Sequence, residues 1–180
     1  MIRLFTAIAI PEQIRVRLSL MQGGVPGARW SPLENLHLTL RFIGEVDHVT
    51  ARDIDSMLAG MRMNAFDLTL KGVGEFGGRE PRALWAGVQP SEPLARLASK
   101  IETALHRMGI EGEARKYTPH ITLAYLKDAP LQKVSEFLAS HSLFDSGPFH
   151  VSSFGLYSSH PSPNGSQYTL EASYALGSEG

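Results

Sequence analysis

One short pattern occurs twice in the sequence: residues 35–40 read Asn-Leu-His-Leu-Thr-Leu, and residues 118–123 read Thr-Pro-His-Ile-Thr-Leu. In each copy a histidine and a threonine stand two residues apart among apolar residues, which is the alternation of a half-buried strand. The polar pair of each copy therefore shares one face of its strand, while leucine or isoleucine packs the other face.

The two copies belong to a longer repetition along the chain. His37 and His120 are 83 residues apart, and the same offset separates Phe66 from Phe149 and Gly72 from Gly155. Residues 4–11 resemble residues 83–90 at an offset of 79, so that a four-residue difference falls in the first helix and its loop. An internal duplication implies an approximate two-fold axis, across which the two motifs face each other. We therefore predict one two-lobed domain over residues 1–180, with repeat halves of about 1–80 and 81–180.

Alternating period-2 and period-3.6 patterns predict the other elements. Strands are expected at residues 4–10, 36–42, 66–70, 83–88, 120–126, 149–156 and 168–176. Helices are expected at residues 14–21, 47–61, 94–105 and around 134–138. The glycine-rich residues 74–81 and the turn-rich residues 158–166 are predicted to be loops, the second long enough to be mobile.

Composition excludes several classes of protein. Lys and Arg total 17 against 18 for Asp and Glu, and the net charge of −1 excludes a broad basic surface for nucleic acid while leaving room for a ligand with one or two phosphates. The absence of cysteine excludes disulfides, thiolate zinc sites and cysteine nucleophiles. No apolar stretch is long enough to cross a bilayer. We interpret residues 1–10 as a buried strand rather than a signal peptide and expect a cytoplasmic protein.

Two facing His–Thr pairs suit in-line displacement at phosphorus. One imidazole takes a proton from the attacking oxygen while the other gives a proton to the leaving oxygen, a task that histidine performs near neutral pH. The hydroxyls of Thr39 and Thr122 can donate to the non-bridging phosphate oxygens.

A single His-x-Thr would be no more than the polar face of a strand, and its recurrence at a shared offset is what favours catalysis. The other five histidines, at positions 48, 106, 141, 150 and 160, are interpreted as surface or satisfied core residues. Each motif offers one good metal ligand with no carboxylate or thiolate at ligand spacing, so we expect no metal site. A Ser–His–Asp triad stays open, although no G-x-S-x-G motif is present.

The sequence resembles the two-histidine (HxTx) phosphoesterases and, within them, the bacterial and archaeal RNA 2′,3′-cyclic phosphodiesterases, also called 2′,5′ RNA ligases. The resemblance covers nearly the whole chain. Besides the two motifs, it includes residues 3–8, residues 41–46 (Arg-Phe-Ile-Gly-Glu-Val), residues 81–87 (Pro-Arg-Ala-Leu-Trp-Ala-Gly), residues 156–159 and Gly165 with Tyr168.

The resemblance implies a bilobal, internally duplicated α+β fold, with antiparallel sheets lining a central cleft and helices outside. It implies hydrolysis of a terminal RNA 2′,3′-cyclic phosphate to a 2′-phosphate without a metal or other cofactor, and a related 2′,5′ ligation with an RNA 5′-hydroxyl group. His37, from the first motif, would be the proton donor, and His120, from the second, the proton acceptor. The expected partners are RNA ends such as those of tRNA fragments, with no membrane, and the expected state is a monomer.

One position departs from the family pattern. Many relatives carry an arginine five residues after the second histidine, where this chain has Tyr125. We expect Tyr125 to pack on the apolar face of its strand, with the positive charge supplied instead by Arg41, on the face of His37 and Thr39, or by Arg115 and Lys116.

Other residues carry weaker signals. Trp85 is expected in the core, Arg79 and Arg82 on a solvated loop, and His160 and Asn164 near the mouth of the cleft without a catalytic role. Two alternatives stay open at this point. One is a phosphodiesterase for a cyclic phosphate of a nucleotide or of an ADP-ribose derivative, and the other is a non-catalytic module that binds RNA ends.

Overall fold

The computed structural model describes residues 1–112, 115–163 and 165–177. Its elements, in chain order, are β1 (Ile2–Ala9), α1 (Glu12–Leu20), β2 (Ala28–Trp30), the 3₁₀ turn η1 (Leu33–Asn35), β3 (His37–Val46), α2 (His48–Ala59), β4 (Phe66–Phe76), β5 (Ala83–Val88), α3 (Glu92–Arg107), β6 (His120–Leu126), α4 (Leu131–His141), β7 (Asp145–Val151), β8 (Ser153–Ser162) and β9 (Gly165–Ala175). All pairs of these strands are antiparallel, so the predicted α+β class is confirmed.

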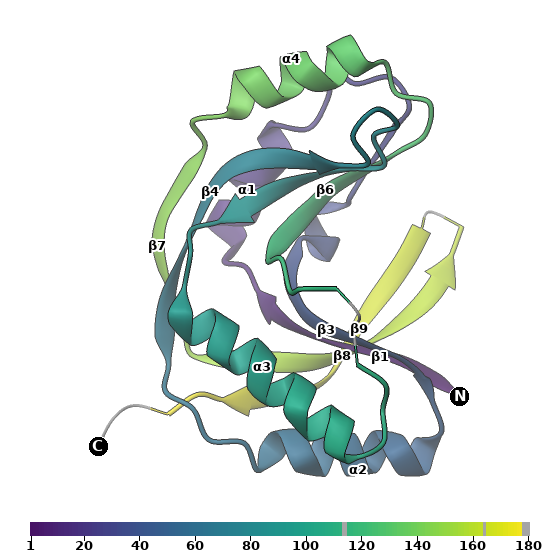
Figure 1. Cartoon of the computed structure of the whole chain (residues 1–180), viewed down its shortest axis with the longest axis vertical. Helices are drawn as coiled ribbons and strands as arrows, with labels where there is room; N and C mark the ends of the chain where they lie inside the picture. The colour runs from purple at the N-terminus through teal and green to yellow at the C-terminus, as the bar shows by residue number, and fades with distance from the viewer. Residues whose placement is uncertain (113–114, 164, 178–180) are drawn as a thin grey trace.

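Two sheets form the frame of the molecule (Figure 1). The first has the strand order β3-β1-β8-β9, and the second has the order β2-β6-β5-β4-β7. Helices α2 and α3 contact the first sheet through β9 and β3, and α4 contacts the second sheet through β4. Helix α1 joins α4 on the second sheet, where the Arg17 guanidinium donates to the main-chain oxygens of Asp145 and Ser146. The sheets thus lie between two helix pairs.

Each sheet contains strands from both halves of the chain. Strand β4 belongs to the first half of the sequence but pairs with β5 and β7 of the second half. Strands β8 and β9 belong to the second half but lie in the sheet of β1 and β3. The order β3-β1-β8 in one sheet therefore matches the order β6-β5-β4 in the other. The boundary between the two sequence halves does not coincide with the boundary between the sheets.

Strand register corrects the details of the predicted repeat. His37 lies opposite Ala9, as His120 lies opposite Gly87, so β1 and β5 are equivalent at an offset of 78 rather than 79. Phe66 and Phe149 lie in neighbouring strands of one sheet, β4 and β7, and are not equivalent.

Several predicted loops and strands were wrong in extent. Strand β4 continues to Phe76, into the segment expected to be a glycine-rich loop, and β8 and β9 pair as far as Ser162 and Gly165 in the segment expected to be a mobile loop. The strand expected at residues 149–156 is divided at Ser152 between β7 and β8, which belong to different sheets. Cross-strand pairing decides these boundaries, and glycine, serine and proline give no apolar alternation that reveals it.

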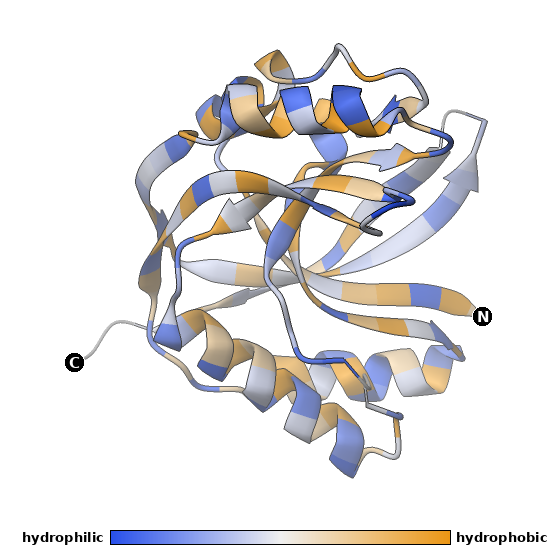
Figure 2. Cartoon of the chain, turned by 45° about the horizontal axis from the view of Figure 1, so that its top comes forward, coloured by the Kyte–Doolittle hydropathy of each residue, from blue (hydrophilic) through white to orange (hydrophobic). Residues whose placement is uncertain are grey.

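The core lies between the sheets and their helices. Figure 2 shows apolar residues on the helix faces that are turned toward the sheets. Ile54 and Leu58 of α2 and Leu97, Ile101 and Leu105 of α3 are fully buried there. In the described part of the chain, no helix has the length and apolar character needed to span a membrane.

Gly74 in β4 makes room for the indole ring of Trp85 on the neighbouring strand. The two residues are cross-strand partners, and a Cβ atom on Gly74 would lie 2.2 Å from two carbons of that ring. The indole contacts the rings of Phe76 and His120. A glycine at position 74 therefore leaves the space that the indole of Trp85 occupies beside His120.

We expect Gly74→Ala to lower the free energy of unfolding by about 1–3 kcal/mol, the usual cost of overpacking a filled site. Gly60→Ala is the matched control, because its Cβ would lie 3.6 Å from the nearest atoms. Urea denaturation of both variants measures the difference. Equal stability of the two variants would contradict the tight packing of Trp85 on Gly74.

Candidate active site

The two motif strands contribute to one cleft with a volume of about 1130 Å³. His37 and Thr39 of β3 and His120 and Thr122 of β6 all line it, so the structure brings the four predicted residues together. Helix α3 and residues 115–118 complete the lining on one side, and β2 and the β8–β9 hairpin complete it on the others.

Each histidine is held by the same local hydrogen bond. Nδ1 of His37 lies 2.7 Å from the main-chain oxygen of Asn35, and Nδ1 of His120 lies 2.7 Å from that of Thr118. A carbonyl oxygen only accepts, so Nδ1 carries the hydrogen in both rings. Nε2 is thereby left as the proton-exchanging atom of both neutral imidazoles.

Aromatic rings surround His37. Its ring stacks on Phe5 with centroids 5.1 Å apart, meets the edge of Tyr168 at 5.1 Å, and lies 6.4 Å from Tyr157. Its Nε2 accepts a hydrogen bond of 2.9 Å from the hydroxyl of Thr39. Burial lowers the pKa of His37 from 6.5 to about 4, with the charge of His120 as a smaller cause in the same direction and the bond to Asn35 opposing both.

His120 has a different environment. The edge of Phe76 meets its ring with centroids 4.9 Å apart, and Trp85 lies 6.3 Å away. Trp85 does not line the cleft, and its Nε1 is buried with no hydrogen-bond partner in the described part of the chain. The two histidines therefore share a backbone geometry but differ in their surroundings.

A bulge occurs at the same place in both motif strands. Thr6 and Ala7 pair with Arg41 and Thr39, which leaves Leu40 as the extra residue in β3. Leu84 and Trp85 pair with Ala124 and Thr122, which leaves Leu123 as the extra residue in β6. One extra residue exchanges the faces of all later side chains on a strand.

The bulge corrects the prediction for Arg41. This residue shares the face of Leu38, toward the core, rather than the face of His37 and Thr39. Its side chain is 6% exposed, forms an ion pair with Glu102 of α3, and donates to the main-chain oxygens of Phe42 and Glu111. Arg41 touches the cleft but is engaged by these partners, so it ties β3 to α3.

The bulge also corrects the prediction for Tyr125. Tyr125 shares the face of Thr122, lines the cleft, and is 52% exposed, whereas it was expected to pack with Ile121 and Leu123. Phe42 occupies the equivalent position in β3 and is 57% exposed.

Positive side chains line the cleft in addition to Arg41. They are Arg29, Arg82, Arg115 and Lys116, and none of the four has an ion pair among the residues that the structure describes. Arg115 and Lys116 were expected here, whereas Arg82 was expected on a solvated loop and Arg29 was not singled out. Strand β2, which carries Arg29, is too short to show a sequence pattern.

Other residues singled out in the sequence do not line the cleft. Arg79 and His160 are exposed and are not among the described residues that line it, and Nε2 of His160 lies 3.1 Å from the hydroxyl of Ser158. Asn164 lies outside the described residues. Among those residues, no further histidine lines the cleft, and no group of three His, Asp or Glu side chains is placed to hold a metal ion.

Sequence reasoning missed Tyr117. Its hydroxyl donates to the main-chain oxygen of Thr39 at 2.9 Å and so links the segment before the second motif to the strand of the first. Burial raises the pKa of Tyr117, which keeps the hydroxyl protonated as a donor. A tyrosine three residues before a histidine gives no sequence signal for this contact.

Known proteins resemble this chain over most of its length. Residues 10–162 match the family model of the 2′-5′ RNA ligase superfamily. A protein of Thermotoga maritima named RNA 2′,3′-cyclic phosphodiesterase is 34% identical over 180 aligned positions, covering 93% of this chain and 92% of that protein. The Escherichia coli protein of the same name is 32% identical, covering 97% of this chain and 96% of that protein.

A solved structure agrees with these sequence matches. The crystal structure of E. coli LigT complexed with 3′-AMP superposes with a TM-score of 0.79 at 30% identity and covers 97% of this chain and 98% of that one. Fold, motif geometry and sequence similarity agree, and the chain belongs to the 2′-5′ RNA ligase superfamily.

Proposed function

We propose that this protein hydrolyses the terminal 2′,3′-cyclic phosphate of RNA to a 2′-phosphate, with His37 and His120 as the acid–base pair. The observation that carries the proposal is the matched setting of the two imidazoles. Each donates from Nδ1 to the carbonyl oxygen two residues earlier, and both line one cleft. The names of the relatives from T. maritima and E. coli support the choice of substrate.

The proposed reaction is one displacement at phosphorus. The oxygen of a water molecule attacks the phosphorus, and Nε2 of His120 takes a proton from this water. As the new P–O bond forms, the bond from phosphorus to the 3′ oxygen breaks, and Nε2 of His37 protonates that oxygen. The product carries a 2′-phosphate and a 3′-hydroxyl group, and each proton transfer contributes roughly 10²–10⁴-fold to the rate. An RNA 5′-hydroxyl group in place of water would give a 2′,5′ linkage by the same steps.

His37 must gain a proton before it can act as the donor. Burial lowers its pKa to about 4, so the free protein holds it uncharged at neutral pH. A phosphate anion beside Nε2 favours the charged imidazolium and raises the pKa. In this proposal, substrate binding itself loads His37 with the proton that it later delivers.

The threonines hold the phosphate. The hydroxyls of Thr39 and Thr122 would donate to the non-bridging oxygens, on which negative charge grows in the transition state. Thr39 can do this by releasing its hydrogen bond to His37, whose Nε2 is then free for the proton. Arg115 and Lys116 would add positive charge at the cleft.

We further propose that one chain suffices for activity, because both histidines and both threonines come from the same chain. The substrates would be RNA ends such as those of tRNA fragments, and the protein would act in the cytoplasm.

His37→Ala and His120→Ala should each lower kcat/KM by roughly 10²–10⁴-fold on a short RNA with a 2′,3′-cyclic phosphate end, because each removes one proton transfer. The assay contains EDTA and identifies the terminal phosphate that is formed. His150→Ala is the control, because this exposed histidine pairs with Asp67 away from the cleft. Wild-type protein that binds the RNA but does not cleave it in EDTA would contradict the proposal.

Thr39→Val and Thr122→Val should each lower kcat by roughly 10²–10³-fold, the usual loss for one donor to a developing anion. Thr39→Ser and Thr122→Ser keep the hydroxyl and should retain most of the activity. The measurement is steady-state kinetics on the same RNA. Equal impairment of the valine and serine variants would contradict the proposed role, because the serine variants keep the hydroxyl.

The imidazole of His37 should titrate with a midpoint near pH 4 in the free protein, because burial favours its neutral form. Histidine resonances followed by NMR test this, and saturating adenosine 2′-phosphate should raise the midpoint. A midpoint near 6.5 without ligand would be inconsistent with the buried setting of His37.

A further inference from the structure

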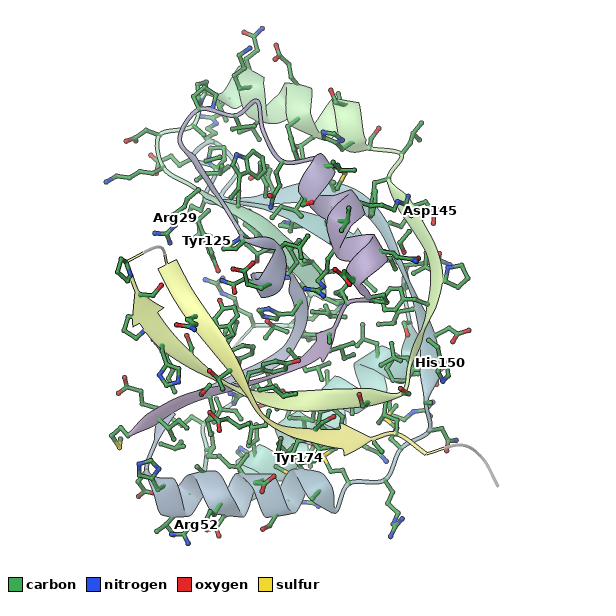
Figure 3. All side chains as sticks on the ribbon, turned by 180° about the vertical axis from the view of Figure 1, so that it is seen from behind. Arg29, Arg52, Tyr125, Asp145, His150 and Tyr174 are labelled. Carbon is green, nitrogen blue, oxygen red and sulfur yellow. The ribbon has the colours of Figure 1, made fainter. Side chains whose placement is uncertain are left out.

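We propose that Arg29 and Tyr125 form a binding site for a second nucleotide, on the 5′ side of the reacting end, so that the enzyme selects an RNA chain over a mononucleotide 2′,3′-cyclic phosphate. This inference rests on the proposed function and adds to it the part of the substrate that the wall of the cleft would recognise. Figure 3 shows the two side chains together at one end of the second sheet, beside the β8–β9 hairpin.

Arg29 and Tyr125 lie side by side because their strands, β2 and β6, are neighbours in the second sheet. Arg29 of β2 lies opposite Tyr125 of β6, and its Cζ atom lies 6.0 Å from the centroid of the phenol ring. Both residues line the cleft. A stacking ring beside a guanidinium group matches the two parts of a nucleotide, the flat base and the anionic phosphate.

Strand β2 holds Arg29 in a fixed position. The ring of Trp30 packs on that of Phe137 in α4, with centroids 5.6 Å apart. The main-chain N–H of Ser31 and the side-chain amide of Gln22 both donate to the oxygen of the bulge residue Leu123, at 2.8 and 3.3 Å. The bulge that exposes Tyr125 is therefore also the anchor of the strand that carries Arg29.

The two sheets offer different surroundings at the equivalent positions of Phe42 and Tyr125. Phe42 is the equivalent of Tyr125 in the first sheet, but its ring lies against Phe5, with centroids 5.8 Å apart. The described cation–ring contacts include Tyr125 and do not include Phe42. The wall of the second sheet is thus the one that offers both stacking and charge.

The cleft that Tyr125 lines also holds the two motif histidines. Tyr168 of β9 contacts the ring of His37, and it also lines the cleft. Tyr168, from the first sheet, and Tyr125, from the second, line the same cleft. Tyr125 is five residues from His120, roughly 15 Å along an extended strand, which is a distance for a neighbouring nucleotide rather than for the reacting phosphate.

Charge supports a substrate longer than one nucleotide. A mononucleotide cyclic phosphate carries one negative charge, and the histidines and threonines already face it. The cleft holds four further cations that lack an ion pair in the described residues, although the whole chain has a net charge of −1. Additional phosphodiester groups would give these cations partners.

The test compares adenosine 2′,3′-cyclic phosphate with an adenylate trinucleotide that has the same cyclic end. The measured quantity is the ratio of kcat/KM for the trinucleotide to kcat/KM for the mononucleotide. The wild-type ratio should exceed one, and Tyr125→Ala and Arg29→Ala should each lower it about tenfold, the scale of one lost base stack. Tyr125→Phe keeps the ring and should retain most of the ratio, and Arg52→Ala, on exposed α2 (Figure 3), should leave it unchanged.

Binding gives a second readout that does not need catalysis. The affinity of each variant for the trinucleotide ending in a 2′-phosphate is measured at several salt concentrations. Loss of one phosphate contact in Arg29→Ala should reduce the slope of log affinity against log salt by about 0.7. Tyr125→Ala should weaken binding without changing that slope.

The outcomes separate the two proposals. If wild-type protein hydrolyses neither compound, the proposed function fails, and the binding measurement still decides whether Arg29 and Tyr125 hold RNA. The inference is overturned if Tyr125→Ala and Arg29→Ala lower kcat/KM equally on both compounds, so that its ratio does not change. It is also overturned if the salt slope of Arg29→Ala equals that of Arg52→Ala.

Discussion

A bulge at the same place in each motif strand, at Leu40 in β3 and at Leu123 in β6, sets the arrangement of the cleft. Before the bulge, a histidine and a threonine face the cleft while an apolar residue packs inward. After it, the faces exchange, so that Arg41 turns into the core, and Phe42 and Tyr125 turn outward. The same local distortion therefore separates the face of the His–Thr pairs from the side chain of Arg41 that contacts α3, and it places Phe42 and Tyr125 on the walls of the cleft. Because the pattern of hydrogen bonds on both sides of the bulge is antiparallel, the strands continue through it as parts of their sheets.

The near-symmetry of the cleft provides two similar imidazoles, and its departures from symmetry make them chemically different. Both rings have the same bond from Nδ1, but His37 lies among Phe5, Tyr157 and Tyr168, whereas His120 contacts Phe76 and Trp85. Acid–base catalysis needs two groups in different protonation states, and unequal environments are a general way to obtain them. Here the difference arises from which strands lie beside each motif, and therefore from the exchange of β4 and β8 between the sheets.

The distribution of charge in the cleft follows the same division. Arg41 forms an ion pair with Glu102 that joins β3 to α3, so its charge is already balanced inside the protein. The other basic residues of the cleft stand on β2, on the segment before β6 and at the start of β5, where they surround the motif face. The cleft of a chain with a net charge of −1 is thus lined by more basic than acidic side chains.

The two motif strands, the helices between them and the α+β class could be predicted from the sequence alone, because apolar periodicity is a local property that a single segment displays. The repetition along the chain also predicted that His37, Thr39, His120 and Thr122 face one cleft, and all four line it. The register of the strands, the bulges, the exchange of β4 and β8 and the short strand β2 were decided by the tertiary structure. Each depends on hydrogen bonds between segments far apart in sequence, as when the oxygen of Leu123 receives the N–H of Ser31. For that reason Arg41 and Tyr125 were assigned to the wrong faces, and Arg29 acquired a role only once its strand had a neighbour.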